Sequence, residues 1–206
     1  MKYSISSKFE ALIGEKILND LNSHPSTVYG LDSNLNISYL NPGWFKFSED
    51  NGNKIFISDE WSLGRNIFDC IPNVFESFYR NLFETTLNEE KPPVNPRQLE
   101  YECSSPELYR KFSMHLYSMG KEGILVINSL VVEEPHATLP VEGLLKFDEK
   151  DYIDEDGILH QCANCRRIQN IRTPKQWDWI PTFIEKPHPK TSHAVCSPCK
   201  QYYYLS

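Results

Sequence analysis

Two Cys-x-x-Cys pairs in the last quarter of the chain constrain its folding more than any other feature. Cys162 and Cys165 form the first pair, and Cys196 and Cys199 form the second. Each pair presents two thiolates across a tight turn. Together they supply the four soft ligands that Zn²⁺ takes in a tetrahedron, at about 2.3 Å from the metal. A site closed by four protein ligands has no open position for a substrate, so its role is structural rather than catalytic.

Other interpretations of the same cysteines are an iron site of rubredoxin type, two disulfides, or four free thiols. Disulfides are less favoured because the N-terminal sequence lacks the apolar stretch of an export signal. Cys-x-x-Cys pairs in a cytosolic protein more often bind metal or carry redox chemistry. The surrounding segment is short and polar, so metal binding would supply its folding free energy. Structural zinc is therefore expected, and the unpaired Cys70 and Cys103 are expected to be ordinary core thiols.

The composition is that of a folded, acidic protein. Its 206 residues are 40% hydrophobic and 13% aromatic, which is enough to build one or two domain cores. The formal net charge of −7 disfavours general binding to nucleic acid, because phosphate backbones are held by an excess of lysine and arginine. No apolar run reaches the roughly 18 residues that a membrane-spanning helix needs. The sequence predicts a cytoplasmic protein without membrane contacts.

Residues 1–23 predict an amphipathic helix. Ser7 and Glu10 have the spacing of a capping box, in which each side chain accepts a hydrogen bond from a free backbone N–H of the first turn. Apolar residues then recur at three- and four-residue intervals over residues 5–21. Such a stripe either packs on its own domain or forms the seam of a homodimer. The residues assigned to the dimer seam are Phe9, Leu12, Ile13 and Ile17.

Residues 24–133 predict a unit with two strands, then helices, then three strands. The expected strands cover residues 27–31, 36–40, 98–103, 109–119 and 123–132, and the longest helix covers 74–87. The expected fold class is α+β, with a five-stranded antiparallel sheet, helices on one face, and a small zinc-stabilised C-terminal module. Residues 134–158 are expected to be a connector and residues 159–206 the zinc-binding module.

The order of these elements resembles a PAS sensor domain. The motifs that carry the resemblance are Val28-Tyr-Gly-Leu-Asp32, Tyr39-Leu-Asn-Pro42, Leu63-Gly-Arg-Asn-Ile-Phe-Asp69, Tyr101-Glu-Cys-Ser-Ser-Pro106 with Arg110-Lys-Phe112, and the strand at 124–130. The resemblance covers residues 24–133. It implies a sensor of a ligand or partner, often dimeric through a helix that precedes the core.

A ligand pocket in such a domain would be lined mainly by aromatic side chains. The candidate residues are Tyr29, Phe45, Phe68, Phe78, Leu82, Tyr101, Phe112 and Met114. Few polar groups accompany them to orient a ligand, so the interior is expected to be filled mainly by its own side chains. Neither haem nor flavin is expected. Residues 74–87 contain no histidine for a haem iron, and Ile67 stands where photoactive flavin-binding PAS domains have a cysteine.

The cysteine-rich segment resembles the tail that follows PAS or receiver domains in bacterial signalling proteins. The likeness lies in Cys162-Ala-Asn-Cys-Arg-Arg-Ile168, an aromatic stretch after it, and Ser192-His-Ala-Val-Cys-Ser-Pro-Cys199. Ala194, Val195 and Ser197 replace the glycine, isoleucine and proline of that pattern, and none of these changes removes a thiolate.

Neighbouring histidine, basic and aromatic residues are further candidates. A site closed by four thiolates needs neither His160 nor His193 as a ligand, so both are expected to make local hydrogen bonds or lie on the surface. The basic and aromatic set comprises Arg166, Arg167, Arg172, Trp177 and Trp179. It is interpreted as aromatic packing over the zinc turns, as a docking face, or as a nucleic-acid surface.

No enzymatic activity is expected, because the sequence has no glycine-rich phosphate loop, kinase ATP-binding motif or cyclase signature. The sequence instead predicts a non-catalytic bacterial signal-transduction protein. It would act as a PAS sensor or docking module, through a homodimer and a signalling-protein partner. The alternatives are a nucleic-acid-binding regulator that uses the basic and aromatic residues, and a thiol-based redox switch that loses its metal when the thiolates are oxidised.

Overall fold

The chain divides into two compact units. The computed structural model describes residues 3–50, 62–89, 96–105, 107–135 and 148–204. The first unit comprises Met1–Glu100 and Ser113–Ser129, and the second comprises Tyr101–Phe112 and Leu130–Ser206. The division falls inside three strands of one sheet, so the far ends of those strands belong to the same unit as the C-terminal segment.

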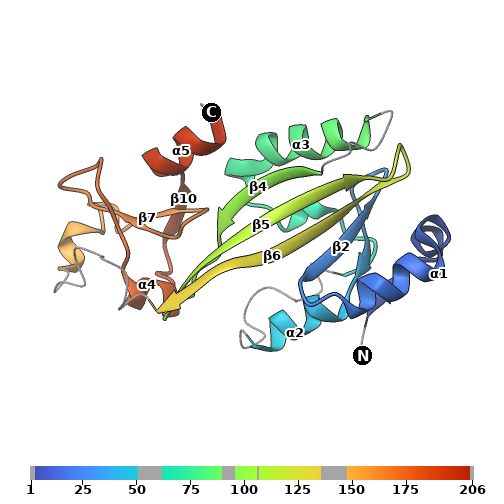
Figure 1. Cartoon of the computed structure of the whole chain (residues 1–206). Coiled ribbons are helices and arrows are strands. Elements are labelled where there is room, and N and C mark those ends of the chain that lie inside the picture. The colour runs from blue at the N-terminus through green and yellow to red at the C-terminus, as the bar shows by residue number, and fades with distance from the viewer. Residues whose placement is uncertain (1–2, 51–61, 90–95, 106, 136–147, 205–206) are drawn as a thin grey trace. The chain divides into compact units, whose positions relative to one another are not determined.

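The first unit is built on an antiparallel sheet that has six strands rather than the predicted five, in the order β1-β3-β2-β6-β5-β4. Strands β2, β6, β5 and β4 lie side by side in Figure 1. The strands are β1 (Ser4–Ile5), β2 (Thr27–Asp32), β3 (Ile37–Leu40), β4 (Arg97–Glu102), β5 (Leu108–Ser118) and β6 (Gly123–Pro135). The additional strand, β1, pairs with β3. Its two residues are too few to show the alternation by which a strand is recognised in a sequence.

Helices cover both faces of this sheet, so the prediction of helices on one face only is wrong. They are α1 (Ser7–Ser23), α2 (Pro42–Asp50) and α3 (Asn73–Leu87), with a 3-10 turn η2 (Ile67–Asp69) before α3. Successive side chains of a strand point to opposite faces. At Gly30 of β2, an added Cβ would lie 2.2 Å from the ring of Phe9, so glycine lets α1 approach the sheet closely. Tyr29 points to the other face and meets Trp44 of α2 edge to face, with ring centroids 5.8 Å apart.

The helix α1 differs from its prediction in its cap and in its straightness. The N-cap is Ser6, whose hydroxyl accepts a hydrogen bond from the Phe9 N–H at 3.3 Å, so the capping box predicted at Ser7 and Glu10 is wrong by one residue. Gly14 interrupts the helix with a φ of 72°, a conformation that glycine adopts without steric cost. The helix therefore bends at Gly14.

This bend divides the stripe that was assigned to a dimer seam. Phe9 and Ile13 are buried in the core of their own chain, with exposed fractions of 2% and 5%. Leu12 is partly buried against the same core. Ile17 is 49% exposed. The four side chains therefore do not form one free face, and only Ile17 is largely available to a partner.

Asn41 connects three elements of the first unit from a fully buried position. Its side-chain oxygen accepts hydrogen bonds from the backbone N–H groups of Val28 and Trp44, both at 2.9 Å. Its amide nitrogen donates to the carbonyls of Ser26 at 2.9 Å and Leu21 at 3.2 Å. One side chain thus links the end of α1, the start of β2 and the first turn of α2.

The second unit has its own four-stranded sheet in the order β10-β7-β8-β9. Its elements are η4 (Glu149–Asp151), β7 (Leu159–Cys162), β8 (Ile168–Gln169), β9 (Trp177–Asp178), α4 (Pro181–Glu185), β10 (Thr191–Ala194) and α5 (Ser197–Tyr204). Tyr152 lies in the predicted connector, yet it packs in the core of this unit with Leu159 and Phe183. Its hydroxyl donates to Asp178 at 2.8 Å.

The segment 141–145, part of the predicted connector, lies outside the described residues. In the part of the chain that the structure does describe, no helix combines the length and the apolar character needed to cross a bilayer.

Candidate metal centre

The two Cys-x-x-Cys turns meet because β7 and β10 run parallel. Leu159 lies opposite Thr191, and Cys162 lies opposite Ala194. Parallel neighbours end at the same edge of a sheet, so the turn after Cys162 and the turn just beyond Ala194 come together there. The Ala163 N–H donates to the Ala194 carbonyl at 2.9 Å, which extends the pairing into the first turn.

Backbone hydrogen bonds shape each turn around its sulfur atoms. In the first turn, the Arg166 N–H donates to the Cys162 carbonyl at 2.9 Å, and Arg166 has a left-handed φ of 60°. The Cys162 N–H donates to the carbonyl of Arg167, the residue after Arg166, at 2.8 Å. In the second turn, the Lys200 N–H donates to the Cys196 carbonyl at 2.8 Å. Both Cys-x-x-Cys segments are thus held by backbone hydrogen bonds, the second by the first turn of α5.

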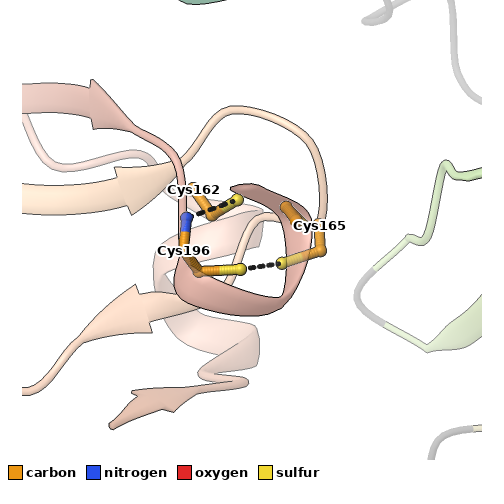
Figure 2. Close-up of side chains that lie close together, drawn as sticks. Cys162, Cys165 and Cys196 are labelled. Carbon is orange, nitrogen blue, oxygen red and sulfur yellow. Dashed lines mark hydrogen bonds between the residues drawn. The ribbon is translucent and has the colours of Figure 1, made fainter. Parts of the chain in front are cut away.

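The four sulfur atoms all lie within 4.8 Å of one another. Figure 2 shows the Cys165 and Cys196 sulfurs facing each other, 3.6 Å apart. A regular tetrahedron with metal–sulfur bonds of about 2.3 Å separates its ligands by about 3.8 Å, whereas a disulfide bond is about 2.05 Å long. All four thiols are free, and none is more than 9% exposed. The predicted metal-binding cluster is confirmed as a cluster of cysteines arranged to hold a metal ion.

Hydrogen bonds among the thiols shift their pKa values in opposite directions. Hydrogen bonds from Cys165, Cys196 and Cys199 lower the pKa of the Cys162 thiol. Hydrogen bonding to Cys162 raises the pKa of Cys196 and of Cys199. Four negative charges this close repel one another, so complete deprotonation requires a compensating metal ion.

Polar groups around the cluster are aimed at individual sulfurs. The Cys196 N–H donates to the Cys162 sulfur at 3.5 Å (Figure 2). The side-chain amide of Asn164, inside the first turn, donates to the Cys199 sulfur at 3.3 Å. Such second-layer donors stabilise thiolate charge and hold the ligands in place. The spacing of the cysteines alone gave no signal for Asn164.

The cysteines and histidines that were not expected to be ligands stay outside the cluster. The Nε2 atom of His160 lies 3.1 Å from a carboxylate oxygen of Asp154, as a local hydrogen bond. His193 is exposed on β10. Cys70 and Cys103 are half-buried thiols, and burial raises the pKa of Cys103.

The basic and aromatic residues do not gather on one exposed face. Trp179 is buried, with 8% of its surface exposed, and Trp177 is half-buried in β9. The Arg172 guanidinium lies 2.7 Å from the Asp151 carboxylate. Arg166 forms the left-handed turn described above. The burial of Trp179 supports the interpretation that this side chain packs within the second unit.

The candidate pocket residues are divided between the two units. Tyr29, Phe112 and Met114 are buried, whereas Phe45, Phe68, Phe78, Leu82 and Tyr101 are half-buried. In the second unit, Tyr101 stacks on Phe112 with ring centroids 5.6 Å apart. In the first unit, Phe68 packs on Phe83 at 6.2 Å. Phe83 is completely buried and was not among the pocket candidates, although the apolar spacing of its helix includes it.

No protein-family model matches the chain. A search of curated proteins likewise found no match. Functional inference therefore starts from the four-cysteine cluster and from the residues around it.

Proposed function

We propose that this chain is a non-catalytic signal-transduction protein in which a PAS-type sheet unit docks partners and a zinc ion holds the C-terminal module. The cluster of four buried cysteines carries this proposal. Soft thiolate ligands in a tetrahedral arrangement suit Zn²⁺, and four of them leave no position for a substrate. When bound, zinc would supply folding free energy to the module and neutralise thiolate charge.

The PAS-type assignment is supported by the element order and by the positions of two asparagines in the resembling motifs. Two strands, helices and three strands follow one another along the chain. Asn41 joins α1, β2 and α2 by the hydrogen bonds described above. Asn66 caps η2 through the Phe68 N–H and donates to the Asn34 carbonyl at 3.0 Å. A bacterial signalling origin belongs to the same proposal.

Docking is favoured over small-molecule sensing because aromatic side chains pack on one another inside the sheet unit. Tyr79 lies 5.8 Å from Phe83 between ring centroids, next to the contact of Phe83 with Phe68. Contacts of this kind fill space that a ligand would need. We propose that the unit works through protein–protein contacts, with a signalling protein and with a second copy of the chain. Tyr3 and Ile17 are exposed apolar residues available to such contacts.

Purified protein is expected to have no visible chromophore and to release no stoichiometric small molecule when denatured. The physical reasons are the ring contacts of Phe83 with Phe68 and Tyr79, which occupy interior space, and the sequence of α3, which has no histidine to ligate a haem iron. The measurement is an absorption spectrum of fresh protein, followed by mass spectrometry of the denatured supernatant. A visible band, or one bound organic molecule per chain, would replace docking by ligand sensing as the function of the sheet unit.

Nucleic-acid binding is a weaker alternative. The net charge is −7, and two of the arginines that would contact phosphates are paired with carboxylates: Arg172 with Asp151, and Arg167 with Glu102. Phosphate contacts would be recognised by their steep dependence on salt. A gel shift at moderate salt, repeated at higher salt, therefore separates this alternative from docking.

A redox switch is the other alternative, and the 3.6 Å separation of the Cys165 and Cys196 sulfurs favours it. Oxidation by a peroxide would join two such thiolates in a disulfide and release the metal. The burial of all four thiols opposes it, because buried cysteines react slowly. Zinc release by mild peroxide, in parallel with loss of partner binding, would support the switch.

A further inference from the structure

Arg167 lies between the cysteine cluster and the end of a strand that is distant in sequence. Its backbone carbonyl accepts the hydrogen bond from the Cys162 N–H at 2.8 Å, so the residue is fixed to the first turn. Its guanidinium donates to a carboxylate oxygen of Glu102 at 3.4 Å. Glu102 is the last residue of β4, and it belongs to the same compact unit as the cysteines.

The guanidinium is also within hydrogen-bonding reach of a cysteine sulfur. The Cys165 sulfur is among its hydrogen-bond partners, and a guanidinium is protonated throughout the ordinary pH range. The side chains of Arg167 and Glu102 are 37% and 24% exposed, so water screens this charge pair only in part. Arg167 thus carries a fixed positive charge beside the thiolates.

The charge of Arg167 matters for the net charge of the metal centre. Four thiolates around one dication leave two uncompensated negative charges, and a neighbouring guanidinium offsets one of them. The carboxylate of Glu102 accepts a hydrogen bond from the guanidinium and so restrains it. Arg172 lies five residues further along the chain. Its side chain is 66% exposed and pairs with Asp151, a residue outside the cysteine cluster. The two arginines therefore differ in a way that an experiment can use.

We propose that Arg167 is a positioning residue of the metal centre, which compensates thiolate charge and couples the centre to the end of the β4–β5 hairpin through Glu102. The inference rests on the proposed zinc site and deepens it. The hairpin end, Tyr101–Phe112, belongs to the same unit as the cysteines. It is closed by backbone hydrogen bonds, from Cys103 to Arg110 at 3.1 Å and from Ser105 to Leu108 at 2.9 Å. Metal binding should therefore stabilise the end of β4, a strand of the six-stranded sheet.

Zinc affinity of the full chain tests the first half of the proposal. Competition against a chromophoric zinc chelator should show that Arg167→Leu weakens zinc binding roughly 10- to 100-fold, the range seen when second-layer partners of metal ligands are removed. Arg167→Lys, which keeps the charge, should recover most of that loss. Arg172→Leu is the matched control and should change affinity by less than about threefold.

Amide hydrogen exchange tests the coupling to the hairpin. Removal of zinc by chelation should speed exchange in Tyr101–Phe112 of the wild-type protein. Glu102→Gln, a change outside the cysteine-rich segment, should raise that exchange while zinc is still bound and should lower zinc affinity less than Arg167→Leu does. This variant keeps the test decisive if Arg167→Leu does not fold.

Two results would overturn the proposal. Equal zinc affinities for Arg167→Leu and Arg172→Leu would remove the charge-compensating role of Arg167. Hairpin exchange that is the same with and without zinc in the wild type would remove the coupling. A wild-type chain that binds no zinc is a different outcome, because it contradicts the metal site itself before any variant is compared.

Discussion

Replacing Cys165 by serine should release the metal and unfold the C-terminal module, while the first unit stays folded. Serine removes one of four ligands from a buried site, and its hydroxyl is a poor donor for a soft metal ion. Structural zinc sites contribute roughly 10–16 kcal/mol of apparent binding free energy, which for a small module is its folding free energy. The core of the module that remains is small, being built around residues such as Tyr152, Leu159 and Phe183.

Hydrogen exchange monitored by mass spectrometry, together with elemental analysis, measures this outcome region by region. In Cys165→Ser, residues 148–204 should lose protection, whereas β2 and α3 should keep theirs. Cys70→Ser is the matched control, because Cys70 is a half-buried thiol outside the cluster. It should retain one zinc and full protection of the module. Loss of protection throughout the chain in Cys165→Ser would show instead that the two units fold as one.

Replacing Asn41 by leucine should strongly destabilise the first unit. The substitution leaves the N–H groups of Val28 and Trp44 without the acceptor that each now has at 2.9 Å. Each buried donor without a partner costs about 1–3 kcal/mol, so the two together cost about 2–6 kcal/mol. A loss of that size is comparable with the total stability of many domains, which is about 5–15 kcal/mol.

Chemical denaturation of the two variants Asn41→Leu and Asn34→Ala measures this cost. Asn34 is exposed in the turn between β2 and β3, and its replacement should change the free energy of unfolding by no more than about 0.5 kcal/mol. The transition of the first unit should shift strongly in Asn41→Leu, while zinc content stays at the wild-type value. If the two variants unfold at the same denaturant concentration, the hydrogen bonds of Asn41 do not carry the stability assigned to them.

The features that the sequence predicted well are those with a local signal. Helix α3 was expected at residues 74–87 from its apolar spacing and is found at Asn73–Leu87. Strand β2 was expected at residues 27–31 and is found at Thr27–Asp32. The cysteine cluster follows from ligand spacing, because only close pairs of thiols present two donors to one metal. In each case the residues that fix the structure are neighbours in the chain.

The features that the sequence did not predict depend on contacts between distant residues. The parallel pairing of β7 with β10 brings the two turns together. Each strand has only four residues, and the two strands are far apart in the sequence, so the sequence gives no sign that they pair. Tyr152 joins the module core through Asp178, which lies 26 residues away. Arg167 was assigned to a docking or packing set, and only the fold reveals Glu102 beside it. Pairings of this kind leave no periodic pattern in a single sequence.

Native mass spectrometry of the full chain as isolated tests the central claim most directly. The sample is sprayed from a volatile buffer at neutral pH, and elemental analysis of the same sample identifies the metal. The account predicts one zinc ion for each chain, bound through Cys162, Cys165, Cys196 and Cys199 and removed by strong chelators. A folded chain whose mass equals that of the polypeptide alone, or that of a polypeptide with two disulfides, would contradict it.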